Sequence, residues 1–103
     1  MPIPFIRKTS AEACVIGLDF TDDIPEGVTI ASCECSARVR RTEEDVTSTL
    51  LSNGTTAVIS EVANTAKITV SDGERGTMYE IIFTVTLSDA QTIVGRHLVM
   101  VDE

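Results

Sequence analysis

Aromatic side chains are scarce in this sequence. The chain has 103 residues, with no Trp, one Tyr and three Phe. A buried core must therefore consist mainly of Val, Ile, Leu, Ala and Cys, the other residue types that are most often buried. A chain of this length fits one domain with a single core.

Basic residues are also few. Eight Lys and Arg stand against sixteen Asp and Glu, which gives a formal net charge of -8. Nucleic-acid binding relies on Lys and Arg that neutralise phosphates, so this balance predicts no nucleic-acid partner. An acidic surface is typical of a soluble protein or of one with a basic partner. The single basic cluster, Arg38, Arg40 and Arg41, suits an acidic protein neighbour.

Long apolar runs are missing. No segment approaches the roughly 18 residues of a membrane span. Residues 1–5 lack the basic-then-apolar layout of a signal peptide. These observations predict no membrane partner and a protein made and used in a cytoplasm.

The three cysteines are an odd number, which argues against a disulfide-stapled secreted module. A period of two places Cys33 and Cys35 on one face of a strand together with Ala31 and Ala37, so they are expected to be small core residues. In one candidate register, residues 14–20 and 28–39 form a hairpin in which Cys14 lies opposite Cys35.

A metal or catalytic centre is not indicated. The three thiols and His97 include zinc ligand types, but the C-x2-C or H-x3-H spacing is missing, so buried free thiols are favoured. The acidic turn of Asp19, Asp22 and Asp23 lacks the ligand ladder of a calcium loop. For His97, the sequence offers no nucleophile and no orienting acid with which it could form a catalytic site. We therefore expect no cofactor, no metal and no enzyme activity.

The most informative stretch begins at Gly76. After Tyr79, the apolar residues of positions 81–87 recur at every second place, which predicts a half-buried strand. A Tyr that enters such a strand after a glycine turn is typical of the tyrosine corner of immunoglobulin-like sandwiches. We expect its hydroxyl to bond the backbone near residues 73–75.

The rest of the chain is divided into short alternating segments by turn residues. Predicted strands cover residues 14–20, 28–39, 46–51, 56–60, 66–71, 79–87 and 92–101, and Asn53-Gly54 predicts a type I′ hairpin. Residues 40–45 form a charged connection, either a bare loop or one helical turn capped by Thr42. The pattern predicts an all-β protein, an immunoglobulin-like antiparallel β-sandwich of about seven strands in residues 12–103. Residues 1–11, with Pro2 and Pro4, are expected to be an extended N-terminal arm that lies along the body or a neighbour.

The last predicted strand is apolar on both faces. One register buries Val94, Leu98 and Met100, and the other buries the odd-numbered residues 93, 97, 99 and 101. Either a central position or a covering partner subunit explains this pattern. Ile82, on the polar face of its own strand, also indicates partner contact.

Several segments together carry a family resemblance. They are residues 5–8, 16–20, 25–30 and 66–71, the glycines at 73 and 76 with Tyr79, and residues 84–86 with Arg96. In this order they resemble small immunoglobulin-like structural proteins of tailed phages and prophages, sometimes described as fibre-tail adaptors. The resemblance spans nearly the whole chain.

The resemblance implies a non-enzymatic virion structural or adaptor protein, assembled in the bacterial cytoplasm, with virion protein subunits as partners and a homo-oligomer as a further possibility. The residues themselves, in the expected arm and on the polar face of strand 79–87, predict a possible interface at Phe5, Ile6, Arg7 and Ile82. Structural roles are expected for Tyr79, for Gly76, and for the three thiols. The alternative is a bacterial immunoglobulin-like module that binds protein or carbohydrate outside a virion, although the lack of Trp leaves no stacking platform for a sugar.

Overall fold

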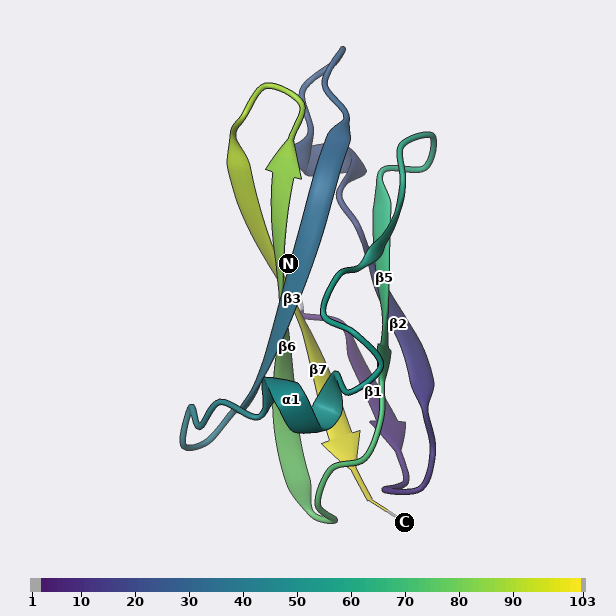
Figure 1. Ribbon diagram of the computed structural model, residues 1–103, viewed down its shortest axis with the longest axis vertical. Coiled ribbons are helices and arrows are strands. Elements are labelled where there is room, and N and C mark those ends of the chain that lie inside the picture. Colours follow the sequence, from purple (N-terminus) through teal and green to yellow (C-terminus); the bar gives the residue numbers. More distant parts are fainter. Residues whose placement is uncertain (1–2, 103) are drawn as a thin grey trace.

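A computed structural model describes residues 3–102 and shows two β-sheets packed face to face (Figure 1). The molecule is elongated, with extents of 43 × 27 × 22 Å. Its elements are β1 (Phe5–Lys8), β2 (Cys14–Asp19), the 3₁₀ helix η1 (Thr21–Asp23), β3 (Ile30–Val39), α1 (Thr47–Leu50), β4 (Val58–Ser60), β5 (Thr65–Val70), β6 (Thr77–Leu87) and β7 (Thr92–Val101). The predicted all-β sandwich is confirmed.

The strand order is that of an immunoglobulin domain. One sheet has the order β1-β7-β6-β3 and the other has the order β2-β5-β4. If the seven strands are lettered A to G along the chain, the second sheet is B-E-D and the first contains C-F-G, as immunoglobulin sheets do. Strand A joins the C-F-G sheet, where β1 runs parallel to β7. This parallel pair departs from the predicted antiparallel arrangement.

The core lies between the sheets and is built from alternate residues of each strand. In β6 the inward side chains are Tyr79, Ile81, Phe83, Val85 and Leu87, all of them buried. In β7 the odd-numbered residues face the same core, and Leu98 is buried on the opposite face as well. The period of two read from the sequence is therefore the pattern of burial in β6.

A β-bulge changes the inward face of β3. Ile30 pairs with Leu87 and Ser32 with Thr86, so two residues of β3 oppose one of β6. Ile30 consequently takes a core position, while Ala31 is exposed. The prediction that Ala31 shares the inward face of the two cysteines is wrong, because the bulge resets the alternation.

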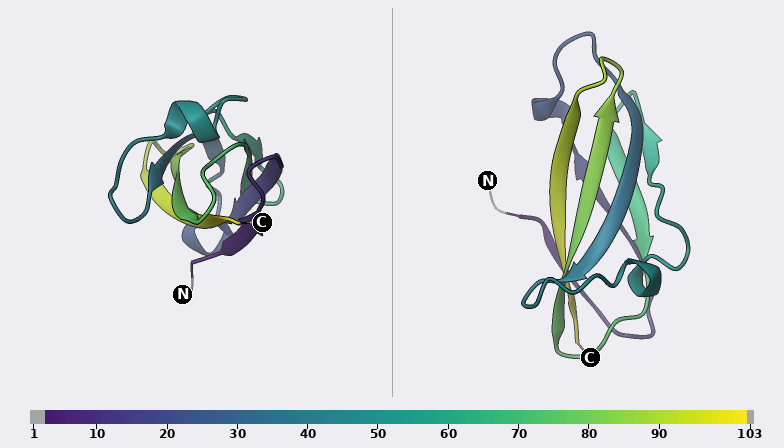
Figure 2. Two further views of the ribbon diagram at one scale, coloured as in Figure 1. Left: turned by 90° about the horizontal axis from the view of Figure 1, so that it is seen from below. Right: turned by 60° about the vertical axis from the view of Figure 1, so that its left-hand side comes forward.

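The candidate hairpin between residues 14–20 and 28–39 is also wrong. β2 pairs with β5, and β3 pairs with β6. Between them, η1 and the following turn carry the chain from one sheet to the other (Figure 2). Cys14 therefore lies opposite Val70 instead of Cys35.

Residues 46–51 form a helical turn instead of the predicted strand. Leu50 and Leu51 both pack into the one core, whereas a strand would point these successive side chains to opposite faces. The Asp45 carboxylate accepts hydrogen bonds from the backbone N–H and hydroxyl of Thr47 at 2.9 and 2.7 Å, at the start of α1. Asn53 does not adopt the positive φ that a type I′ turn requires. Residues 40–45 form no helix; of the two alternatives, the loop is correct.

Residues 5–8 of the expected arm are part of the sheet. Lys8 is buried, and its ammonium group donates to the carbonyls of Thr9 and Asp72, both at 2.6 Å. Residues 1 and 2 of the arm lie outside the described residues, as does residue 103. The boundary at residues 11 and 12 stays a prediction, but β1 does not extend freely from the body. It supplies the seventh strand in place of the predicted strand at 46–51.

The outer edge of β3 is covered by the segment that follows it. Cys35 N–H donates to the Thr55 carbonyl at 2.7 Å, and Ala57 N–H donates to the Cys33 carbonyl at 2.9 Å. Further along, Val46 N–H donates to the Ala37 carbonyl at 2.9 Å. The backbone groups of this edge therefore have partners within the chain.

Candidate docking surfaces

Tyr79 lies where a tyrosine corner requires it. Its hydroxyl accepts a hydrogen bond of 2.8 Å from the backbone N–H of Glu74. Gly73 packs so closely on the Tyr79 ring that an added Cβ would lie 3.1 Å from Cε2. Gly76 has a φ of +80°, and its N–H donates to the Val101 carbonyl at 2.7 Å. These residues hold the loop between β5 and β6 against the body.

The three thiols are free. Cys33 and Cys35 are buried between the sheets, while Cys14 is half-buried at the start of β2. Hydrogen bonding to the Cys33 thiol, together with burial, raises the pKa of Cys35. A thiol with a raised pKa is protonated at neutral pH and is a poor nucleophile or metal ligand.

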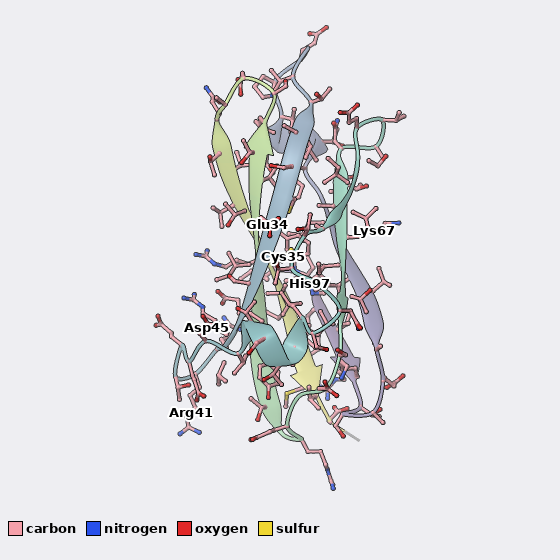
Figure 3. All side chains as sticks on the ribbon, viewed as in Figure 1. Glu34, Cys35, Arg41, Asp45, Lys67 and His97 are labelled. Carbon is pink, nitrogen blue, oxygen red and sulfur yellow. The ribbon has the colours of Figure 1, made fainter. Side chains whose placement is uncertain are left out.

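His97 is another buried polar group. Figure 3 labels it close to Cys35, and both side chains lie on the inner face of the four-stranded sheet. The ring Nδ1 lies 2.9 Å from the carbonyl oxygen of Leu98, and burial lowers the pKa of His97. Within residues 3–102 no group of three metal-ligating side chains comes together. His97 is therefore placed as a component of the core.

Three of the four residues expected at an interface lie on the outer face of the four-stranded sheet. Phe5 is 42% exposed and pairs with Leu98 across β1 and β7. Arg7 lies with its guanidinium 5.6 Å from the centre of the Phe5 ring and 2.6 Å from Asp102. Ile82 is half-buried on the same face. Ile6 is half-buried and packs against the core, because alternate residues of β1 point inward.

Glu80 is a functional candidate that sequence reasoning did not identify. It lies on this outer face but is only 6% exposed. Its carboxylate is 2.7 Å from Arg38 and 3.1 Å from Arg96, which come from the two neighbouring strands. The sequence pattern of β6 places the Glu80 carboxylate on the polar face of the strand. Its ion pairs with Arg38 and Arg96 can be identified only once the pairing of β3, β6 and β7 is known.

Basic side chains gather on and beside this outer face. Four of the chain's eight basic residues lie there: Arg7, Arg38, Arg41 and Arg96. Arg41 lines a depression of about 290 Å³ with Met78 and Met100, and Figure 3 shows its side chain extending away from the body. Val94, on the same face, is 55% exposed. We call this surface of β1, β7, β6 and β3 the outer face; it combines arginine side chains with exposed apolar groups.

A larger cleft of about 770 Å³ opens at the side of the sandwich. It lies between the first half of β7 and the end of β2, and its lining residues are Ile3, Pro4, Gly17, Leu18, Asp19, Phe20, Asp22, Asp23, Ile93, Val94, Gly95 and Arg96. We call it the side groove. The floor is apolar, and three carboxylates lie at its rim. Hydrogen bonds from the hydroxyl and backbone N–H of Thr21 lower the pKa of Asp19, so this group is charged at neutral pH.

The strand order of the two sheets defines the class of the protein: an immunoglobulin-like β-sandwich. A family model described as "Podophage GP4 fiber-tail adaptor protein gp77" matches residues 8–100. Because this match covers most of the chain, the protein belongs to that family of phage fibre-tail adaptors. No curated protein and no solved structure matches.

Membership of this family makes the chain a component of a phage virion that interacts with other virion proteins. The family is a structural one, and it favours the virion interpretation over a binding module outside a virion. No helix among residues 3–102 is long and apolar enough to span a membrane.

Proposed function

We propose that this protein is a non-enzymatic adaptor that joins other subunits of a phage virion, is assembled in the bacterial cytoplasm, and binds one partner through the outer face. The observation that carries the proposal is the combination of exposed Phe5 and Val94 with three arginines on one face of an acidic chain and a fourth, Arg41, beside it. Aromatic residues and Arg are enriched where protein interfaces carry most of their binding energy.

The geometry of β1 supports this role. The Phe5 ring is flanked by the Arg7 guanidinium, which is in turn held by Asp102. A side chain that is already held in place loses less conformational entropy on binding than a mobile one does. Phe5 is therefore an anchor that is positioned before the partner arrives.

The charge of the outer face selects the partner. Arg38 and Arg96 share the buried carboxylate of Glu80, so these three groups together carry one net positive charge. The exposed Glu43 carboxylate lies 3.5 Å from Arg38 and offsets part of it. Arg41 adds another positive charge at the margin of this face. An acidic partner surface is favoured here, and the attraction weakens as salt concentration rises.

Attachment to virion particles tests the proposal. Particles of the phage that encodes this chain, produced without it, are mixed with purified chain, and the bound chain per particle is measured. Replacing an aromatic and an Arg anchor together, with Phe5→Ser and Arg7→Glu, should weaken attachment by at least about tenfold.

The matched control is Val58→Ser on the other sheet. Val58 is 76% exposed, so the change removes an exposed apolar side chain of similar character away from the outer face. This variant should attach like the parent. Attachment of the Phe5 and Arg7 variant at the parental level, with circular dichroism showing that both variants are folded, would refute the assignment of the outer face.

A further inference from the structure

The first half of β7 has an edge that no strand among residues 3–102 covers. β1 pairs with β7 only from Leu98 to Val101. The N–H groups of Leu98 and Asp102 point toward β1, where they bond the carbonyls of Pro4 and Lys8 at 2.8 Å each. Because backbone groups alternate along a strand, the N–H and C=O of Val94 and Arg96 point to the same side, where β1 has already ended.

Pro4 explains why β1 ends there. In a parallel ladder, the next donor after Ile6 along β1 is the N–H of residue 4, and its acceptor is the carbonyl of Arg96. Proline has no N–H, so this bond does not form. The regular ladder is therefore interrupted at Pro4, and no strand within the described part of the chain pairs with the edge of β7 over the residues that line the side groove. We call this the open edge of β7.

The side groove has the chemistry of a strand-binding site. Leu18, Phe20 and Ile93 form an apolar floor directly beside the open edge. Gly95 keeps this part of β7 in close contact with β2, since an added Cβ would lie 2.6 Å from Leu18 Cδ1 and 2.9 Å from Phe20 Cε1. An extended segment laid along the edge would place every second side chain over this floor.

The charges at the rim indicate what kind of segment fits. Asp19, Asp22 and Asp23 surround the side groove, and its single guanidinium, that of Arg96, is already paired with Glu80. The chain itself carries a net charge of -8. A second copy of this chain would therefore bring further negative charge to an acidic rim, whereas a segment with Lys or Arg would neutralise it.

We propose that the open edge of β7, residues 92–96, binds an extended segment of another virion protein, with alternating apolar and basic residues, as an added strand. In this mode the backbone bonds of Val94 and Arg96 provide affinity, while the apolar floor and the carboxylates select the sequence. The inference rests on the proposed adaptor role for the nature of the partner. It assigns a second docking site whose preferred charge is opposite to that of the outer face.

A model peptide tests this site without knowledge of the partner. The probe is a short peptide of alternating valine and lysine, added to the full chain labelled with ¹⁵N. We expect chemical-shift changes confined to residues 92–96 and the groove lining, with slower hydrogen exchange at the Arg96 amide. The same peptide with N-methylated backbone should bind at least about tenfold more weakly, because it loses several hydrogen bonds. A valine–glutamate peptide should also bind more weakly, since it meets the carboxylates.

Two variants at one position separate backbone pairing from surface adhesion. Val94→Pro removes the outward N–H without touching the bonds between β6 and β7, a replacement that edge strands tolerate. Val94→Thr keeps the N–H. Val94→Pro should weaken binding at least about tenfold, and Val94→Thr by no more than about twofold.

Three outcomes would overturn the inference. In the first, the peptide causes no chemical-shift changes at residues 92–96 up to millimolar concentration. In the second, the N-methylated peptide binds as tightly as the unmodified one. In the third, the chain without peptide self-associates through this edge, and Val94→Pro abolishes that self-association. Failure of this site remains distinguishable from failure of the adaptor role. If the chain attaches to particles but does not bind the peptide, the strand-binding site is refuted and the adaptor role stands. If the chain binds the peptide but does not attach to particles, the adaptor role is refuted.

Discussion

The tyrosine corner gives a sharp test of how the fold is held together. Replacing Tyr79 by Phe removes one oxygen from a side chain that is 4% exposed. The ring still fills the same space, so the apolar contribution is unchanged. What is lost is the 2.8 Å hydrogen bond from the Glu74 N–H.

The magnitude follows from the surroundings of the two partners. A typical hydrogen bond contributes about 1 kcal/mol, and a fully buried orphaned donor raises the cost to as much as about 3 kcal/mol. Glu74 is an exposed residue, so water can reach its N–H once the hydroxyl is gone. We therefore expect Tyr79→Phe to lower the free energy of unfolding by about 1 kcal/mol, which corresponds to roughly 4–8 °C in Tm for a domain of this size.

Chemical denaturation followed by circular dichroism measures this change, and Glu74→Ala is the matched control. That variant removes an exposed side chain but keeps the backbone N–H that donates to Tyr79, so its free energy of unfolding should change by less than about 0.5 kcal/mol. Equal midpoints for Tyr79→Phe and the parent would refute the corner as a stabilising contact. A larger loss in the control than in Tyr79→Phe would show that the Glu74 side chain, instead of its backbone, holds the loop.

Two further results are expected. Gly73→Ala should destabilise the protein by several kcal/mol more than Gly54→Ala in the same unfolding assay, because both residues have positive φ but only Gly73 would place a Cβ within 2.8 Å of another side chain; similar losses would mean that the backbone conformation alone matters. The lowered pKa of His97 should make stability fall as the pH drops from about 6.5 toward the folded-state value, because the unfolded chain then binds the proton more readily. His97→Gln should flatten the unfolding free energy in this pH window, and an unchanged pH profile would show that another group titrates there.

Much of the fold was predictable from local pattern. The strand at 77–87 and its partner at 92–101 are long, regularly alternating and separated by a clear turn, so their positions and the side of Tyr79 follow from the sequence. The class of fold follows from the same signals, since short strands at regular spacing favour a sandwich. Local propensity and tertiary structure agree in these segments.

Other features depend on long-range packing that no local pattern carries. Residues 47–50 are rich in Thr and Leu and suit a strand, yet they form a helical turn because Leu50 and Leu51 both fill the core. The bulge at Ala31 is a response to the pairing of β3 with β6. The side groove was not predictable either, because it requires β2 and β7, from opposite ends of the chain, to lie beside each other. From the sequence, the rim residues Asp19, Asp22 and Asp23 were expected to form a solvated acidic turn. No local pattern indicates which segment of the chain lies beside that turn.

The covered edge of β3 has a consequence for assembly. The edge strands of the four-stranded sheet are β1 and β3, and on the β3 side backbone groups of Cys33, Cys35 and Ala37 are already bonded to residues 46–57. A strand contributed by another protein can therefore extend this sheet in one direction only. Open-ended growth of a sheet into a fibre requires two free edges, and the covered β3 edge removes one of them. If the proposed strand addition takes place at β7, the segment that covers β3 limits it to one side of this sheet, although this segment lies at the opposite edge and does not contact the added strand.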